Sequence, residues 1–168
     1  MWIKLLILFL LFGLFGILQT SFFIHFNIIG ATLNLIFILF FLTVFFEEQK
    51  KYIQGIFSAI VAGFFLDIFS SFYIGISIAS LLVIAFAIKY IIYLLKKKRD
   101  RYPIVYFAPL FILFFIIYNL FLTITVYFSS SPHIIPTLSL VFLVEIFYNL
   151  FFAILGFFIY KKFKFYEF

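Results

Sequence analysis

The sequence predicts an all-α integral membrane protein, a single bundle of six transmembrane helices over residues 1–168. The first observation is composition, because 68% of the residues are hydrophobic and only 11% are charged. In soluble domains roughly a quarter of the residues are charged. The second is that 32 Phe and 11 Tyr cannot be hidden by a soluble fold of this size, which buries only about 70% of its extended surface. Lipid is therefore the expected solvent for most of the chain.

The third observation is that the chain divides into six apolar stretches, each close to the roughly 20 residues that cross a bilayer as a helix. We place the spans at residues 2–18, 27–46, 53–74, 75–95, 104–128 and 138–160. The segments between them are 19–26, 47–52, a tight turn at 70–75, 96–103 and 129–137, where charged, polar or turn residues interrupt the apolar runs. All of these connections are short, so no soluble domain is expected.

Basic residues alternate between the two sides of the predicted bundle. They lie at Lys4, at Lys50 and Lys51, in the cluster 96–101 and after residue 160, whereas the intervening loops carry none. Because Lys and Arg accumulate in cytoplasmic loops, both termini are predicted to be cytoplasmic. This sidedness accounts for the net charge of +6, so the basic balance indicates membrane topology and contact with membrane lipids, and we expect no nucleic-acid partner.

The sequence offers no candidate for catalysis, a cofactor or a metal. The chain has no Cys, which excludes disulfides and thiolate ligands, and its two His residues, His25 and His133, lie in outer loops with no carboxylate at ligand spacing. It contains no Ser/His/Asp set and no glycine-rich phosphate loop. An intramembrane acid dyad of Asp67 and Glu145 is the remaining enzymatic alternative. We expect a non-enzymatic protein.

Polar residues inside the spans are informative, because a charge within the bilayer costs a few kcal/mol or more. Asp67, Asn119 and Glu145 each lie roughly 10–13 Å below the outer ends of their spans, at 1.5 Å per residue, and Asn34 lies at a similar depth. Asn149 follows Glu145 one turn deeper on the same face. We predict that these five residues form an intramembrane polar cluster. The alternative is that each one makes a local packing contact.

Lys89 is a lysine within predicted span four, and its expected role differs from that of the polar cluster. Lys89 lies about two turns above the basic cluster 96–101, so its stem can extend toward the membrane surface. We expect Lys89 to act as an anchor, and its depth does not match a pair with Asp67. The basic cluster itself needs no partner, because it serves as a topology determinant.

Small residues recur along the third span. Gly55, Ala59, Gly63 and Asp67 are four residues apart and therefore lie on one face of a helix. Small side chains at this spacing let two helix backbones approach closely, which drives association where lipid offers no hydrophobic force. The pattern predicts a helix-packing or partner interface, and the neighbour is either another span of this chain or a separate protein.

A more specific pattern continues past this face, in which Gly63 and Asp67 are followed by Ser70, Ser71 and Gly75, and then by small residues that open span four. It resembles the rod shape-determining MreD family, small six-span membrane proteins with Gly, three residues and Asp in span three, a Ser/Gly-rich turn and Gly eight residues after the Asp. The resemblance extends to Leu18-Gln19-Thr20-Ser21 and to Ile29-Gly30 before span two, and the chain departs from the family pattern at Leu33-Asn34-Leu35. At the latter the family commonly has Pro-Asp or Pro-Asn, and this chain keeps the amide without the proline.

The resemblance implies a non-enzymatic, multi-pass component of the bacterial cytoplasmic membrane that takes part in peptidoglycan synthesis and cell shape. Members of the family link MreC to MreB filaments and to the glycan polymerase and transpeptidase of the elongation complex, the elongasome. A chain with so little mass outside the bilayer acts through its spans, short loops and termini. The expected ligands are therefore the transmembrane helices of partners.

Two other functions remain open from the sequence. A vitamin-binding subunit of an energy-coupling-factor type transporter also has six spans, and an outer polar layer would suit a ligand pocket. Against it, the outer loops are short and lack the Trp, Arg and Asp residues expected to clamp a vitamin. An ion or proton channel rests on Asp67 and Glu145 alone.

Overall fold

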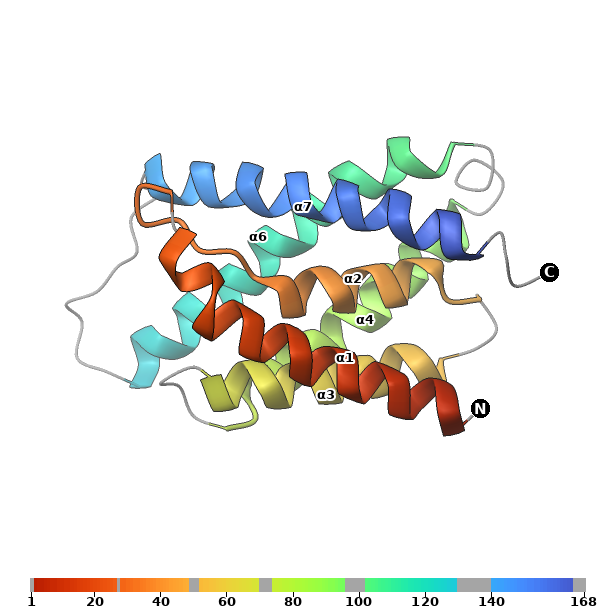
Figure 1. Ribbon diagram of the computed structural model, residues 1–168, viewed down its shortest axis with the longest axis horizontal. Coiled ribbons are helices and arrows are strands. Elements are labelled where there is room, and N and C mark those ends of the chain that lie inside the picture. The colour runs from red at the N-terminus through yellow and green to blue at the C-terminus, as the bar shows by residue number, and fades with distance from the viewer. Residues whose placement is uncertain are drawn as a thin grey trace.

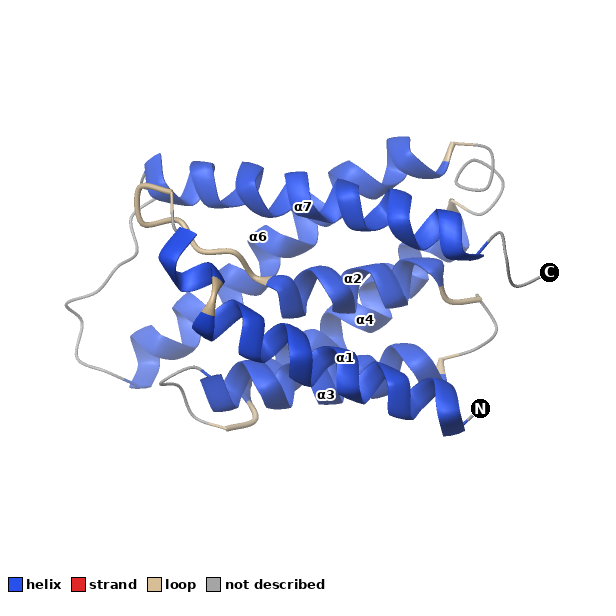
Figure 2. Ribbon diagram, viewed as in Figure 1, coloured by secondary structure: helices blue, strands red, loops and turns tan. Residues whose placement is uncertain are grey.

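The computed structural model describes residues 2–26, 28–48, 52–69, 74–95, 102–129 and 140–164, and within these ranges the chain is all-helical with no β-strand. Six α-helices and one short 3₁₀ helix are described (Figures 1 and 2). In chain order they are α1 (Trp2–Ser21), η1 (Phe23–Phe26), α2 (Leu35–Phe46), α3 (Ile53–Phe69), α4 (Ile76–Leu94), α6 (Pro103–Ser129) and α7 (Leu140–Lys164).

Four of these helices are long and apolar enough to cross a membrane: α1, α4, residues 103–125 of α6 and residues 140–162 of α7. α2 and α3 are equally apolar but have only 12 and 17 residues. They are therefore about 18 and 26 Å long, against a hydrocarbon core of about 30 Å. The all-α prediction is confirmed, and the described part of the chain contains four candidate spans in place of the six expected.

α2 is the central helix, and it packs against α1, α3, α4, α6 and α7 (Figure 1). Every residue from Ile36 to Phe45 is buried, so the helix has no exposed face along this stretch. A helix that is apolar all round is stable only where other elements surround it. Phe41 meets Phe107 and Phe111 of α6 edge to face, with ring centroids 5.3 and 5.2 Å apart. The abundant Phe residues thus form the contact between α2 and α6.

The second predicted span, 27–46, is wrong over its first part, because the helix begins only at Leu35. Residues 28–31 form a tight turn in which Ile28 and Ala31 exchange backbone hydrogen bonds of 3.3 and 2.9 Å. Ile29 and Gly30 have φ angles of 55° and 86°, the left-handed conformations of a type I′ turn. No helix continues through two such residues. The apolar pattern hid this turn because Ile28 and Ile29 are as apolar as the helix that follows.

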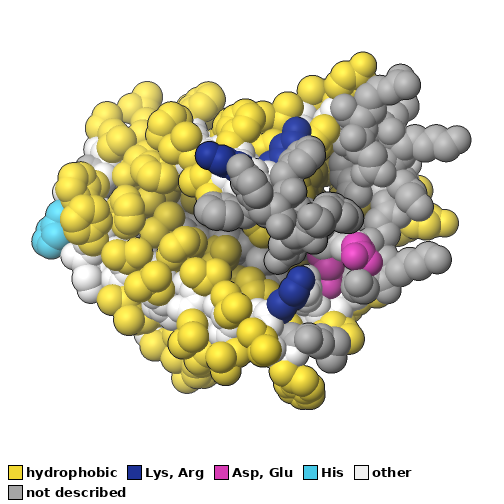
Figure 3. Space-filling model, turned by 45° about the vertical axis from the view of Figure 1, so that its right-hand side comes forward, with side chains coloured by type: hydrophobic (Ala, Val, Ile, Leu, Met, Phe, Trp, Pro, Cys, Tyr) yellow, Lys and Arg dark blue, Asp and Glu magenta, His cyan; other side chains and the backbone are white. Residues whose placement is uncertain are grey.

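The charged side chains mark one end of the bundle. α1 begins and α7 ends at this end, on the right of Figure 1, together with the ends of α2 and α4. Lys4, Lys161 and Lys162 are exposed there, and Figure 3 shows basic and acidic side chains gathered where this end comes forward. Hydrophobic side chains cover most of the remaining visible surface (Figure 3). The described helices therefore have the apolar flanks and charged end of a membrane bundle.

The third and fourth helices pack backbone to backbone. A Cβ placed on Gly63 would lie 2.5 Å from the backbone nitrogen of Ile78 in α4 and closer still to its Cα. Real Cβ atoms essentially never come so near to backbone atoms. The small-residue face of α3 is therefore used at Gly63 by a neighbouring helix of the same chain.

Replacing Gly63 with Ala should destabilise the protein by about 1–3 kcal/mol, because the new methyl group must push α3 away from the backbone of α4. The matched control is Gly13→Ala in α1, whose methyl group would meet only the ring of Phe65 at 3.4 Å. That variant should unfold like the original protein or slightly later, because Ala favours a helix by up to about 1 kcal/mol over Gly. Thermal unfolding in detergent measures both, and equal midpoints for the two variants would contradict close packing at Gly63.

Candidate functional site

Polar side chains of α7 hold the start of α2. The Oδ1 atom of Asn149 accepts the backbone N–H of Asn34 at 2.7 Å, and its Nδ2 atom donates to the carbonyl of Thr32 at 2.9 Å. Asn34 is the N-cap of α2, and its side-chain oxygen accepts the N–H of Phe37 at 2.9 Å. Gln19 of α1 accepts the N–H of Ile36 at 3.4 Å. Three side chains thus satisfy the first N–H groups of a helix that begins inside the bundle.

Glu145 joins the same group from one turn earlier on α7. Its carboxylate accepts a hydrogen bond of 2.9 Å from the hydroxyl of Thr32. Its backbone carbonyl accepts a hydrogen bond of 2.9 Å from the Nδ2 atom of Asn149. Asn149 is fully buried, whereas Glu145 is half-buried and Thr32 is exposed. This group therefore runs from the bundle interior at Asn149 to its surface at Glu145.

Asp67 performs a similar task at the start of α4. Its two carboxylate oxygens accept the backbone N–H groups of Gly75 at 2.6 Å and Ser77 at 3.0 Å. Gly75 is the N-cap of α4 and has a φ of 108°, which glycine adopts without strain. Asp67 is only 2% exposed, and a negative charge is favourable at a helix N-terminus. The carboxylate near the end of α3 thus locks the turn that returns the chain into α4.

The predicted polar cluster is therefore split. The structure brings Asn34, Glu145 and Asn149 together at the start of α2, as described above. It places Asp67 at the α3–α4 turn instead, and Asn119 bonds to its own helix, donating to the carbonyl of Phe115 at 2.9 Å. These contacts thus place the five residues in three places, because equal depth in different helices does not fix the direction in which each side chain points.

A third polar group lies at the opposite end of α2, and the sequence interpretation missed it. Glu47 follows α2, and its carboxylate accepts the N–H groups of Gln54 at 2.9 Å and Gly55 at 3.1 Å at the start of α3. The Nζ atom of Lys89 lies 2.6 Å from the same carboxylate and also donates to the carbonyl of Glu48 at 3.1 Å.

Lys89 is therefore not the anchor that the sequence suggested. Its side chain is 5% exposed and that of Glu47 is 1% exposed, so the two form a buried ion pair. A buried pair is tolerated when further hydrogen bonds satisfy both groups, as they do here. The sequence could have indicated this pair, because Lys89 in predicted span four and Glu47 after predicted span two both lie near the predicted cytoplasmic side.

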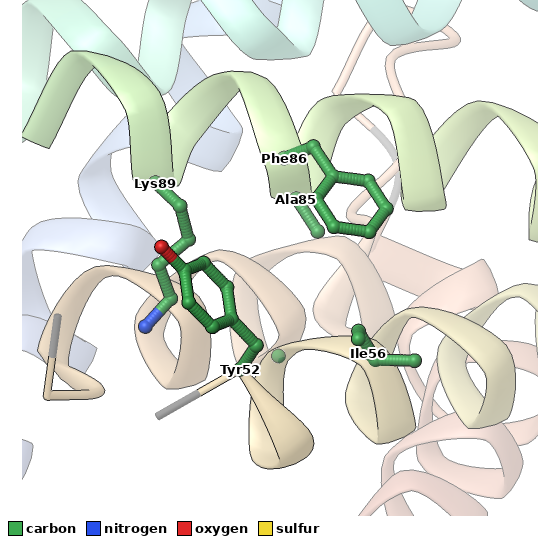
Figure 4. Close-up of a pocket in the computed structure, with 6 residues that line it drawn as sticks. Tyr52, Ile56, Ala85, Phe86 and Lys89 are labelled. Carbon is green, nitrogen blue, oxygen red and sulfur yellow. The ribbon is translucent and has the colours of Figure 1, made fainter. Parts of the chain in front are cut away.

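The ring of Tyr52 lies beside this pair, with the Nζ atom of Lys89 5.7 Å from its centroid. Figure 4 shows Lys89 extending from α4 toward Tyr52 at the start of α3. These residues line a small indentation of about 10 Å³ together with Gly55, Ile56, Ala85 and Phe86. Pockets that bind small molecules usually measure about 300–1,000 Å³, so this one is small for a ligand site.

The small-residue face of α3 is occupied within the chain along its length. A Cβ on Gly55 would lie 2.8 Å from the Oε2 atom of Glu47, so the missing side chain makes room for that carboxylate. Ala59 is fully buried, and Gly63 and Asp67 contact α4 as described above. Ser70 and Ser71, which belong to the same predicted interface, lie outside the described residues.

The buried polar atoms of the described residues are satisfied within the chain. Every buried side-chain nitrogen or oxygen in these ranges has a hydrogen-bond partner. The described residues also contain no group of three or more His, Asp or Glu side chains placed to hold a metal ion. The polar residues inside the described helices thus have structural partners, including backbone groups at helix starts and carbonyls of their own helix. No family model, curated protein or solved structure matches this chain.

Replacing Asp67 with Asn should destabilise the protein by about 1–3 kcal/mol, because an amide oxygen can accept one of the two N–H groups while the NH₂ group confronts the other. Asn119→Ala is the control, since Asn119 bonds only to a carbonyl of its own helix among the described residues. It should cost less than about 1 kcal/mol. Unfolding in detergent followed by circular dichroism compares them, and an unchanged Asp67→Asn midpoint would refute the cap.

Proposed function

We propose that this protein is a non-enzymatic membrane scaffold of the bacterial cell-elongation complex, similar to MreD. In this role it binds MreC in the cytoplasmic membrane and connects MreB filaments with the glycan polymerase and transpeptidase that build the lateral wall. The observation that carries the proposal is that three residues of the family pattern, Gly63, Asp67 and Gly75, form one structural unit. Gly63 admits the backbone of α4, Asp67 caps α4, and Gly75 supplies the positive φ of that cap.

The spacing of the pattern is explained by this unit. Three residues separate Gly63 from Asp67, so both lie on the face of α3 that meets α4. The Gly eight residues after the Asp is the residue whose N–H group the carboxylate binds. Because these residue types depend on one another geometrically, their joint presence is a more specific resemblance than small residues alone.

The start of α2 supports the proposal independently. The family commonly has Asp or Asn at the position of Asn34, and Asn34 is an N-cap whose side chain binds the N–H group of Phe37. Asp and Asn are interchangeable as N-caps, because each offers an oxygen to the first turn. The amide kept in this chain thus has the role that either residue type would fill.

A scaffold of this kind acts through its helix surfaces. Large apolar side chains are exposed along α1, α4, α6 and α7, including Leu10, Tyr90, Val105 and Phe147 at 61%, 66%, 61% and 68%. In a bilayer such faces contact either lipid or the transmembrane helices of other proteins. The proposed partners, MreC above all, therefore engage the outer faces of these helices, while α2 and α3 hold the bundle together.

We further propose that all six predicted spans cross or enter the cytoplasmic membrane and that both termini are cytoplasmic. The chain has no Cys, so single cysteines report sidedness without background. Lys4→Cys should react with an impermeant maleimide only after the membrane is opened, whereas His25→Cys should react in intact cells, because the two lie at opposite ends of α1 and η1. Equal reactivity of both from one side would contradict this topology.

Co-purification tests the function. The tagged full-length protein, extracted from its native membranes in mild detergent, should recover MreC together with cell-wall synthases at levels at least about tenfold above a tagged unrelated multi-pass protein of equal abundance. Mass spectrometry of both proteins and small molecules identifies what is bound. Recovery of a metabolite together with an ATPase module would overturn the proposal and favour a solute-binding transporter subunit.

A further inference from the structure

The half-buried carboxylate of Glu145 differs from the other two carboxylates within the bundle. Asp67 and Glu47 each accept two backbone N–H groups, and Glu47 also has Lys89 as a counter-ion. In the described part of the chain, the Glu145 carboxylate has one neutral hydrogen-bond donor, the hydroxyl of Thr32, and no ion pair. The described residues around it therefore supply no counter-charge.

The position of Glu145 makes that charge accessible from the side of the bundle. It lies five residues after Leu140, so about 7.5 Å along α7 from the first described residue of the helix. Its partner Thr32 is exposed, and the hydroxyl of Tyr148, one turn further along α7, donates to the carbonyl of Phe26 at 3.2 Å at the surface. The carboxylate thus opens onto the flank of the bundle between α7 and the segment 28–32.

Exposed apolar side chains lie on the stretch of chain that leads to Thr32, the hydrogen-bond partner of this carboxylate. Phe26, Ile28 and Ile29 are 54%, 46% and 68% exposed, and Gly30 lies beside Val141, four residues before Glu145. The exposed lysines of the described chain, Lys4, Lys161 and Lys162, lie at the other end of the bundle. An acid at this depth facing only lipid is unfavourable, so the surface calls for a positively charged partner.

We propose that Glu145 and Thr32 form the polar centre of a docking surface for a partner's transmembrane helix that carries a Lys or Arg in its outer turn. The exposed apolar side chains of Phe26, Ile28 and Ile29 pack against that helix, and the basic side chain extends to the carboxylate. Charge complementarity carries the choice of partner. This inference rests on the proposed function, and it assigns the contact with a partner's transmembrane helix to α7, Phe26 and the segment 28–32.

Glu145→Gln is the test, because an amide oxygen still accepts the hydroxyl of Thr32 and the fold is preserved. Recovery of the co-purified partner should fall by at least about fivefold. Glu48→Gln is the matched control: it removes an exposed carboxylate at the other end of the bundle and should leave recovery unchanged. Size-exclusion profiles of both variants should match the original protein. Undiminished recovery with Glu145→Gln overturns the inference.

Two further experiments distinguish a partner helix from a lipid on this surface. A photo-crosslinking residue at Ile29 should capture the partner, and the same residue at Val83 of α4 should not, because α4 packs against α2, α3 and α6 rather than α7. Glu145→Lys should abolish recovery, and exchanging the partner's outer Lys or Arg for Glu should restore it. If Ile29 captures only lipid and native mass spectrometry finds a Glu145-dependent aminolipid, the helix-docking proposal is wrong.

If the original protein recovers no partner at all, the proposed function fails, whereas a partner recovered equally by the original and Glu145→Gln proteins contradicts only this surface.

Discussion

The need to satisfy the first backbone N–H groups of each helix is the constraint on which this structure depends. Inside a bilayer no water is available to bind them, so a helix that begins below the membrane surface must receive acceptors from the protein itself. Here α2 receives Asn34, Asn149 and Gln19, α3 receives Glu47, and α4 receives Asp67. Five polar side chains of the described residues are used in this way.

These caps also determine which helices become neighbours. Asn149 comes from the last helix, so the bond to Asn34 brings α7 against the start of α2, more than one hundred residues earlier in the chain. Glu47 joins the end of α2 to the start of α3, and Lys89 adds α4 to the same point. Van der Waals packing then completes the arrangement, with Phe rings filling the contact between α2 and α6 and with Gly63 allowing α3 and α4 to touch. Hydrogen bonds and an ion pair connect particular helices, and close packing of apolar side chains stabilises their contacts.

The short α2 follows from the same constraint. A type I′ turn at Ile29 and Gly30 and an N-cap at Asn34 end any helix before Leu35, so the chain enters the bundle as non-helical backbone beside α7. Backbone outside a helix lacks the regular hydrogen bonds of one, and Asn149 supplies two of them here, to the carbonyl of Thr32 and the N–H group of Asn34. On the surface of the bundle, this segment exposes apolar side chains, and its Thr32 binds the carboxylate of Glu145. The turn that shortens α2 thus also creates a surface that combines apolar side chains with a carboxylate.

The sequence by itself determined the all-α membrane class, the approximate places of the helices and the end of the bundle at which charge gathers, because hydropathy and charge act along the chain and need no knowledge of contacts. It also singled out Gly63, Asp67 and Gly75, whose spacing is local to one helix hairpin. Only the tertiary structure decided that Gly63 faces α4 of the same chain, that Asp67 is a cap apart from Glu145, and that Lys89 pairs with Glu47. The physical reason is that depth can be counted from sequence, whereas the direction of a side chain around its helix, and so its partner, is fixed only when the helices pack.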